Sequence, residues 1–138
     1  MKGIIKKTIA GIMAVSLFMA VPVHAEEIEL RKMHTTAYCQ GTTTATGVPV
    51  REGICAVKRE WIGKIAVVYA NDNGKPGELL GIYECLDTGF GADSDGDGIG
   101  SIQEGKVIDV YFSTLERCRE WMKLTNGKCF VQLIDAEG

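Results

Sequence analysis

The sequence predicts a small, mainly antiparallel β-barrel with one helix before its last strand. Six short segments have the composition and spacing of β-strands, and a single segment has the pattern of an amphipathic helix. The length of the chain predicts a single domain. Without its first 25 residues the 138-residue chain is long enough to bury one hydrophobic core, but it is short for two domains.

The amino terminus has the pattern of a secretory signal peptide. Three lysines precede an apolar run over residues 9–21, and the small residues at 23–25 suit signal-peptidase cleavage. The run is shorter than the roughly 20 residues that a membrane-spanning helix needs. We therefore expect removal of residues 1–25 on export, which leaves residues 26–138 as one secreted or cell-wall-associated domain. A retained membrane anchor is the alternative.

The predicted mature domain is acidic. Removal of three of the 15 basic residues leaves 12 against 18 acidic ones, a formal charge of −6. This balance argues against nucleic acid or an anionic membrane surface as a partner. Since no second long apolar run follows, we expect no membrane association after cleavage.

The strand predictions follow from turn formers between short apolar segments. The Thr- and Gly-rich loop at 41–47 separates the first two strands, and a turn at 61–63 separates the second from the third. Residues 71–77 are nearly all turn formers, so the third and fourth strands should pair as a hairpin. The six predicted strands are 28–38, 53–57, 64–70, 79–86, 106–112 and 129–134.

The helix is predicted from its start, its apolar face and its end. Ser113 and Glu116 have the spacing of a capping box, and Gly127 is suited to end the helix in a left-handed conformation. The predicted apolar face consists of Leu115, Cys118, Trp121, Met122 and Leu124.

Five cysteines follow the signal segment, an odd number for an exported chain, so at least one is free or pairs between molecules. Cys118 and Cys129 flank the turn from the helix to the last strand and could close a short loop by a disulfide. Pairing among Cys39, Cys55 and Cys85 stays open, as does the alternative of buried reduced thiols. The spacing does not suit a zinc site.

Residues 93–104 match the twelve-residue calcium loop of EF-hands. The pattern has carboxylates at positions 1, 3 and 5, glycine at 6, a carbonyl ligand at 7 and glutamate at 12. We expect Ca²⁺ as a cofactor here, although Gly100 replaces the usual apolar residue at position 8 and no helices flank the loop. A surface loop without metal is the alternative. The expected ligands are Asp93, Asp95, Asp97, Ile99 through its carbonyl, Ser101 and Glu104.

Two aspartates lie in strand-like runs, Asp87 in CLDTG and Asp109 in VIDVY. A carboxylate flanked by apolar strand residues is costly to desolvate and tends to hold its proton, as a general acid must. Apolar-apolar-Asp-Thr-Gly is also the signature of aspartic proteases, which could act as homodimers. That signature requires Ala or Ser after the glycine, whereas Phe90 follows here.

Five motifs occur in the order seen in the 3D (three-aspartate) domain family: TAY at 36–38, the Thr/Gly loop, GICAV at 53–57, GIYECLDTG at 81–89 and VIDVYF at 107–112. The chain resembles this family over roughly residues 33–134. The family is similar to the barrel of MltA-type lytic transglycosylases and, more distantly, to the RlpA and expansin barrels. The resemblance implies a six-stranded double-psi β-barrel that acts on bacterial peptidoglycan.

The resemblance also implies roles for individual residues. Asp109 stands where these barrels keep their acid and Asp87 stands beside it, whereas Thr36, Tyr38 and Thr88 are expected to line the substrate groove. In lytic transglycosylases a carboxylic acid protonates the glycosidic oxygen between N-acetylmuramic acid and N-acetylglucosamine. The muramyl 6-hydroxyl then attacks and forms a 1,6-anhydro product. We therefore expect a glycan-cleaving enzyme of this kind, or a hydrolase of the same bonds.

Three departures from the family pattern support an alternative. Lys58 occupies the position of the first family aspartate, Phe90 replaces the usual second glycine, and the calcium-type loop lengthens the segment before Asp109. The alternative is a non-catalytic cell-wall or glycan-binding module of the same fold. An ion pair from Lys58 to Asp87 or Asp109 would lower the pKa of that acid and oppose catalysis.

Overall fold

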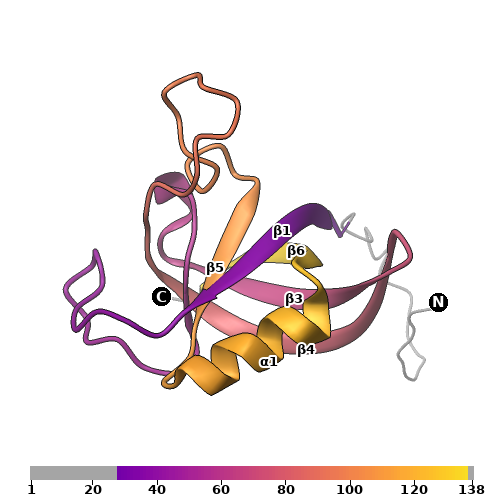
Figure 1. Cartoon of the computed structure of the whole chain (residues 1–138), viewed down its shortest axis with the longest axis horizontal. Coiled ribbons are helices and arrows are strands. Elements are labelled where there is room, and N and C mark those ends of the chain that lie inside the picture. The colour runs from indigo at the N-terminus through magenta and orange to yellow at the C-terminus, as the bar shows by residue number, and fades with distance from the viewer. Residues whose placement is uncertain (1–27, 137–138) are drawn as a thin grey trace, which may run out of the picture.

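Within residues 28–136, six strands and one helix follow one another in the predicted order. Figure 1 shows their arrangement. The computed structural model describes residues 28–136, so the predicted signal segment lies outside the described residues. The elements are β1 (Arg31–Tyr38), β2 (Ile54–Ala56), the 3-10 turn η2 (Arg59–Trp61), β3 (Lys64–Asp72), β4 (Lys75–Asp87), β5 (Val107–Tyr111), α1 (Leu115–Thr125) and β6 (Lys128–Asp135).

The six strands close into a ring in the order β1-β5-β2-β4-β3-β6. Two pairings are parallel, β1 with β5 and β2 with β4, and the other four are antiparallel. The long hairpin of β3 and β4 confirms the predicted pairing of the third and fourth strands. Its turn is shorter than the predicted 71–77, because residues 71–72 and 75–77 belong to the strands and only residues 73–74 connect them. The ring is closed because β6 pairs with both β1 and β3, so each strand has a hydrogen-bonded neighbour on both sides.

Alternation along the strands separates the core from the face that carries Thr36 and Asp109. On β5, Ile108 and Val110 are fully buried, and Asp109 between them points to the other face of the sheet. On β1, Thr35 is buried and Thr36 is exposed. The core therefore takes one face of each strand and leaves Asp109 and Thr36 on the other.

Helix α1 begins one residue later than the capping-box pattern predicts. Thr114, not Ser113, is the N-cap, and its Oγ1 accepts a hydrogen bond from the Arg117 amide at 3.2 Å. The Ser113 amide instead donates to the carboxylate of Glu52. The Ser113–Glu116 capping box is thus wrong, because a tertiary contact with Glu52 takes the amide that the box would use.

The predicted apolar face of α1 is also wrong in part. Cys118 and Trp121 are buried, but Leu115, Met122 and Leu124 are 54%, 36% and 62% exposed. The third buried position is Thr125, whose hydroxyl donates to the Trp121 carbonyl at 2.8 Å. Positions 118, 121 and 125 form a narrow stripe, because the short helix touches the closed sheet along one line only.

Tertiary contacts fasten the helix at its centre and end. Trp121 Nε1 donates to the buried Oγ1 of Thr35 on β1 at 2.9 Å. Asn126 is the left-handed C-cap, with φ of 52°, and Gly127 follows it with φ of 76°. The predicted glycine is left-handed, but the residue that ends the helix is Asn126.

All five cysteines are free thiols in the structure. The disulfide between Cys118 and Cys129 considered from the sequence is absent. Burial raises the pKa of Cys118 to about 11, and the neighbouring Cys39 thiol adds to the shift. No helix within residues 28–136 has the length and apolar composition needed to cross a membrane.

The two neighbouring hydroxyl residues at the start of α1 allow a matched test of the cap. Thr114→Ala should lower the free energy of unfolding by about 1 kcal/mol, because the Arg117 amide loses its acceptor. Ser113→Ala should change it by less than about 0.5 kcal/mol. Urea unfolding of both variants measures the difference. If Ser113→Ala lowered the free energy of unfolding as much as Thr114→Ala or more, the result would support Ser113 as the N-cap instead.

Candidate functional site

The two aspartates flank one residue of the three-residue strand β2. Ala56 is the register partner of Asp109 on β5 and of Asp87 on β4. Neighbouring strands lie about 4.8 Å apart, so the two aspartate Cα atoms are separated by roughly 10 Å across β2. Sheet closure thus brings together two residues that are 22 positions apart in the chain.

A bulge places Asp87 opposite Ala56. Cys55 is aligned with Cys85, but the next pair is Ala56 with Asp87, so Leu86 is the extra residue. In an unbroken strand, Asp87 would share the core face with Cys85. The bulge turns Asp87 away from the core, which is a common use of bulges beside functional sites.

Asp109 is partly buried and has one hydrogen-bond donor. Thr36, its register partner on β1, donates through Oγ1 to Asp109 Oδ1 at 2.9 Å. Burial raises the pKa of Asp109 to about 6; the Thr36 bond opposes this shift and the charge of Asp87 adds to it. A carboxyl group of this kind retains much of its proton in mildly acidic solution and is suited to donate it.

Asp87 has a different environment. The Tyr38 hydroxyl donates to its Oδ2, and the backbone amides of Ala45 and Thr88 donate to its Oδ1, each at 2.9 Å. Three donors around one carboxyl group suit its ionised, acceptor-only form. Burial raises the pKa of Tyr38, and the bond to Asp87 raises it further, so the phenol stays a neutral donor. Asp87 holds neighbouring segments together.

The Thr/Gly loop at 41–47 has a role that the sequence reasoning missed. The Ala45 amide of this loop donates a hydrogen bond to Asp87. Thr46 Oγ1 donates to the Leu86 carbonyl at 3.0 Å and shares a hydrogen bond with the buried Thr44 hydroxyl at 2.9 Å. The loop is thereby fastened to the end of β4. Its high threonine content was the available signal, but no local pattern indicates which strand those groups bind.

Thr88 and Gln103 connect the aspartate motif to the long β4–β5 segment. Thr88 Oγ1 donates to the Val57 carbonyl at 2.7 Å and accepts from Gln103 Nε2 at 2.7 Å. Gln103 also donates to the Gly89 carbonyl and accepts from the Arg59 amide. The Thr88 hydroxyl, expected to bind substrate, is therefore engaged within the protein. Sequence reasoning missed Gln103, which stands among acidic loop residues.

Lys58 does not pair with either aspartate. The ion pairs formed among residues 28–136 include none from Lys58 to Asp87 or Asp109. The side chain lies near Gly105, where its Cδ would be 3.7 Å from a Cβ added to that glycine. The ion pair of Lys58 with an aspartate, considered from the sequence, is thus not formed, and the pKa of Asp109 is raised and not lowered.

Asp109 opens on a cavity of about 600 Å³ between the sheet and the β4–β5 segment. The lining includes Thr36, His34 and Phe90, and Phe90 is 53% exposed. Tyr38 and Asp87 are not among the residues that line this cavity. Of the predicted catalytic and substrate-binding residues, Asp109 and Thr36 therefore face the same space.

A second cavity of about 640 Å³ adjoins the first through His34 and Lys106, which line both. Its wall also carries Lys32 and Lys128, several side-chain amides and no carboxylate. In a chain with more acidic than basic residues, this is a basic site beside the Asp109 cavity. It is suited to bind a carboxylate or another anionic group.

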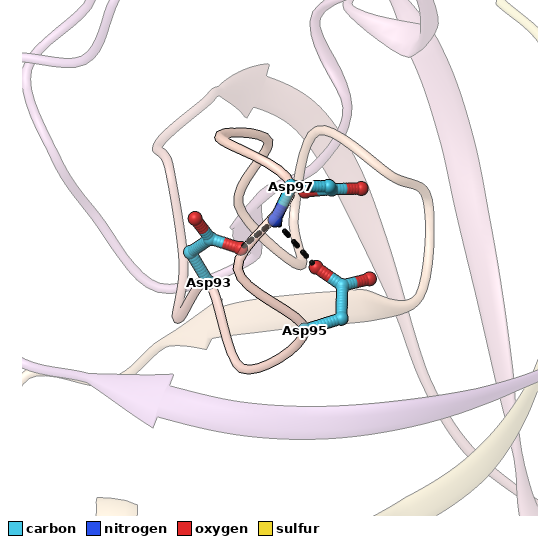
Figure 2. A group of neighbouring side chains, drawn as sticks. All are labelled: Asp93, Asp95 and Asp97. Carbon is cyan, nitrogen blue, oxygen red and sulfur yellow. Dashed lines mark hydrogen bonds between the residues drawn. The ribbon is translucent and has the colours of Figure 1, made fainter.

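The calcium-type loop brings together the side chains expected at its first three ligand positions. One carboxylate oxygen from each of Asp93, Asp95 and Asp97 lies within 4.8 Å of the others. The backbone amide of Asp97 donates hydrogen bonds to the carboxylates of Asp93 and Asp95, at 3.2 and 3.3 Å (Figure 2). All three are exposed, and exposed acidic groups of this kind also occur without metal.

The later positions of the loop differ in their fit. Burial and a hydrogen bond with Asp97 raise the pKa of Glu104, which places position 12 beside the acidic group. Lys106 lies 3.5 Å from Glu104 and 3.7 Å from Asp95. Ser101 Oγ accepts from the Ala92 amide at 3.2 Å, so its hydroxyl fastens the base of the loop. The Ile99 side chain is exposed, and its backbone amide donates a hydrogen bond to Asp97 Oδ1 at 2.8 Å.

Packing explains the glycine at position 8. A Cβ added to Gly100 would lie 2.0 Å from the backbone oxygen of Phe90, so no side chain fits. The loop runs from β4 to β5 without a flanking helix in this part of the chain, as its sequence suggested. Gly100 thus serves the close approach to Phe90 that shapes the Asp109 cavity.

Comparisons of the chain with protein-family models, curated proteins and solved structures gave no match.

Because Asp87 and Asp109 have different environments, we expect their replacement by asparagine to change the free energy of unfolding in opposite directions. The folded protein holds the Asp109 proton up to about pH 6, whereas the unfolded chain releases it near pH 4, so the wild-type domain loses stability as pH rises between these values. Asp109→Asn carries no charge and should raise the free energy of unfolding by about 1–3 kcal/mol at pH 7. The gain should vanish below about pH 4.

Asp87→Asn should instead lower the free energy of unfolding by about 1–3 kcal/mol, because its amide nitrogen cannot accept the bonds made to one carboxylate oxygen. Urea unfolding at several pH values measures both variants. The assignment of the two environments would be contradicted by a destabilised Asp109→Asn together with an unaffected Asp87→Asn.

Proposed function

We propose that this protein is a secreted enzyme that cleaves the glycan strands of bacterial peptidoglycan, in the manner of a lytic transglycosylase. The observation that carries the proposal is Asp109, a partly buried carboxyl group with a pKa of about 6 that opens on a cavity. The closed ring with non-sequential strand order supports the finer proposal of a double-psi β-barrel. The ordered motifs of the sequence supply the substrate class.

In the proposed reaction Asp109 donates its proton to the glycosidic oxygen that leaves from N-acetylmuramic acid. The bond between that oxygen and the anomeric carbon breaks, and the muramyl 6-hydroxyl bonds to the anomeric carbon. The 6-hydroxyl proton returns to Asp109, so no water is consumed. Asp87 acts as a positioning residue: its bonds hold β4 and the Thr/Gly loop, and its charge helps to raise the pKa of Asp109.

The cavity walls suit this substrate in two respects. Phe90 is an exposed aromatic side chain that lines the same cavity as Asp109, and aromatic faces provide apolar contact for sugar rings. The adjoining cavity offers Lys32 and Lys128, which are suited to carboxylates on the peptide stems of peptidoglycan. His34 lines both cavities, so an aromatic contact for a sugar ring and a basic contact for an anion lie on either side of this residue.

A non-catalytic glycan-binding module is the second candidate. Two observations favour it: Lys58 stands at the position of the first family aspartate, and the carboxylate of Asp87 is occupied by bonds within the protein. A homodimeric aspartic protease, suggested by the Asp-Thr-Gly triplet, is a minor third candidate. All three differ in what they release from purified sacculi.

Mass spectrometry of sacculus digests tests the proposal. The protein should release muropeptides with 1,6-anhydro ends, and the rate should fall as pH rises above about 6, because the acid loses its proton. Asp109→Asn should lower release by at least about 100-fold. Asp72→Asn, an exposed aspartate at the end of β3, is the matched control and should retain activity.

The remaining outcomes assign the alternatives. Reducing ends would indicate a hydrolase of the same bonds. Protein that pellets with intact sacculi and releases nothing would identify the binding module. Cleavage of a protein substrate that pepstatin inhibits would identify the protease, and an Asp109→Asn variant with full glycan-cleaving activity would exclude Asp109 as the acid.

We further propose that the loop at 93–104 binds Ca²⁺ as a structural ion. The spacing of six ligand positions supports this, as does the convergence of Asp93, Asp95 and Asp97 with Glu104 beside them. Carboxylate oxygens are the ligands that Ca²⁺ prefers, and a cation would relieve the repulsion among these groups. Lys106 partly serves that purpose through its contacts with Asp95 and Glu104.

Calcium should raise the melting temperature by about 5 °C or more at about 100 times its dissociation constant. Mg²⁺ should have less effect, since it demands a stricter octahedral site. Asp95→Asn should abolish most of the calcium response, and the exposed Asp72→Asn should retain it. Thermal unfolding with and without calcium measures the effect; a melting temperature independent of calcium would contradict the proposal.

A further inference from the structure

Two cysteine thiols lie side by side in the centre of the sheet. Cys55 on β2 and Cys85 on β4 are register partners in a parallel pairing, and their sulfur atoms are 3.7 Å apart. Neighbouring strands are spaced by about 4.8 Å, which is within the range of about 4.4–6.8 Å between Cα atoms that disulfides span. The two backbones are therefore at a suitable distance for a covalent bond, and only the sulfur atoms must approach.

Among the other cysteines, Cys118 has the partly exposed Cys39 as a thiol neighbour, whereas no thiol contributes to the pKa of Cys129. Cys129 is as fully buried as Cys55 and Cys85, but burial alone raises its pKa, to about 12, with no contribution from another thiol. The pKa of Cys55 is raised by its hydrogen bond with Cys85 and by burial. Cys129 is thus a matched control for burial without a partner.

We propose that Cys55 and Cys85 form an intramolecular disulfide between β2 and β4 when the protein folds in an oxidising compartment. The oxidant is an external disulfide, either a small molecule such as oxidised glutathione or a protein. The thiolate of one cysteine attacks a sulfur of the oxidant and releases one thiol; the second cysteine then displaces the remaining thiol. Two cysteine thiols are oxidised, one external disulfide is reduced, and the two protons pass to the released thiols.

Burial decides when the bond forms. Both thiols are fully buried in the closed ring, and the raised pKa of Cys55 leaves little thiolate, the form that reacts. Exchange with an external oxidant should therefore be fast during folding, before β2 is covered, and slow afterwards. Once formed, the bond closes the chain from 55 to 85 and fixes β4 two residues before Asp87. It would thus fasten the bulge that orients this aspartate.

Each cysteine lies in a different tryptic fragment, so a peptide map reads the pairing directly. Cleavage after Lys and Arg, except before Pro76, separates the cysteines into fragments 33–51, 52–58, 65–106, 118–119 and 129–138. The reduced, denatured protein is refolded with a mixture of oxidised and reduced glutathione, alkylated, digested and analysed by mass spectrometry. Fragments 52–58 and 65–106 should appear joined, lighter than their sum by two hydrogen atoms, and should separate after reduction.

Two variants and a kinetic measurement make the test specific. Cys129→Ala should retain the joined fragments, and Cys55→Ala should lack them. The oxidised wild type should melt about 5–15 °C above its reduced form, with no such difference in Cys55→Ala. Alkylation of the folded, reduced protein should label Cys55 and Cys85 far more slowly than the partly exposed Cys39. Folded protein from the oxidising mixture with Cys55 and Cys85 both alkylated, or with either joined to another cysteine, would overturn the proposal.

Discussion

The pairing of the short strand β2 with its two neighbours is the constraint on which the candidate site depends. Three residues are enough because β4 and β5 flank them on both sides, and all three are buried. Ala56 then lies between Asp87 and Asp109, and Cys55 lies beside Cys85. A shift of β2 by one residue would move each of these partners to the other face of the sheet.

The two aspartates differ in the number and kind of hydrogen-bond donors around their carboxyl groups. Asp109 has one hydroxyl donor and an apolar strand around it, so desolvation dominates and its pKa rises. Asp87 has three donors: the Tyr38 hydroxyl, the Ala45 amide of the Thr/Gly loop and the amide of Thr88, the next residue in the chain. The same residue type thus has a raised pKa in one position and holds neighbouring segments together in the other. Their separation across β2 lets the charge of one influence the proton of the other.

The sequence predicted the elements better than their contacts. Composition and turn formers located all six strands and the helix, because strand periodicity and turn chemistry are local properties. The capping box failed because the Ser113 amide binds Glu52, which is 61 positions away. The helix face failed because the closed sheet contacts a narrow stripe and leaves Leu115 and Leu124 to solvent. Similar limits apply to the site, where Gln103 and the Ala45 amide act through contacts that no local pattern encodes.

The sequence by itself determined the set of chemical groups: two strand-borne aspartates, an acidic loop with calcium spacing, and five cysteines. These depend on residue identity and short-range spacing, which the chain carries without folding. Only the tertiary structure decided that Asp109 faces a cavity and that Thr88 does not offer a free hydroxyl. It also decided that Cys85 lies beside Cys55. The physical reason is that strand order, register and the bulge at Leu86 arise when the ring closes, since burial and hydrogen bonding over the whole domain select them together.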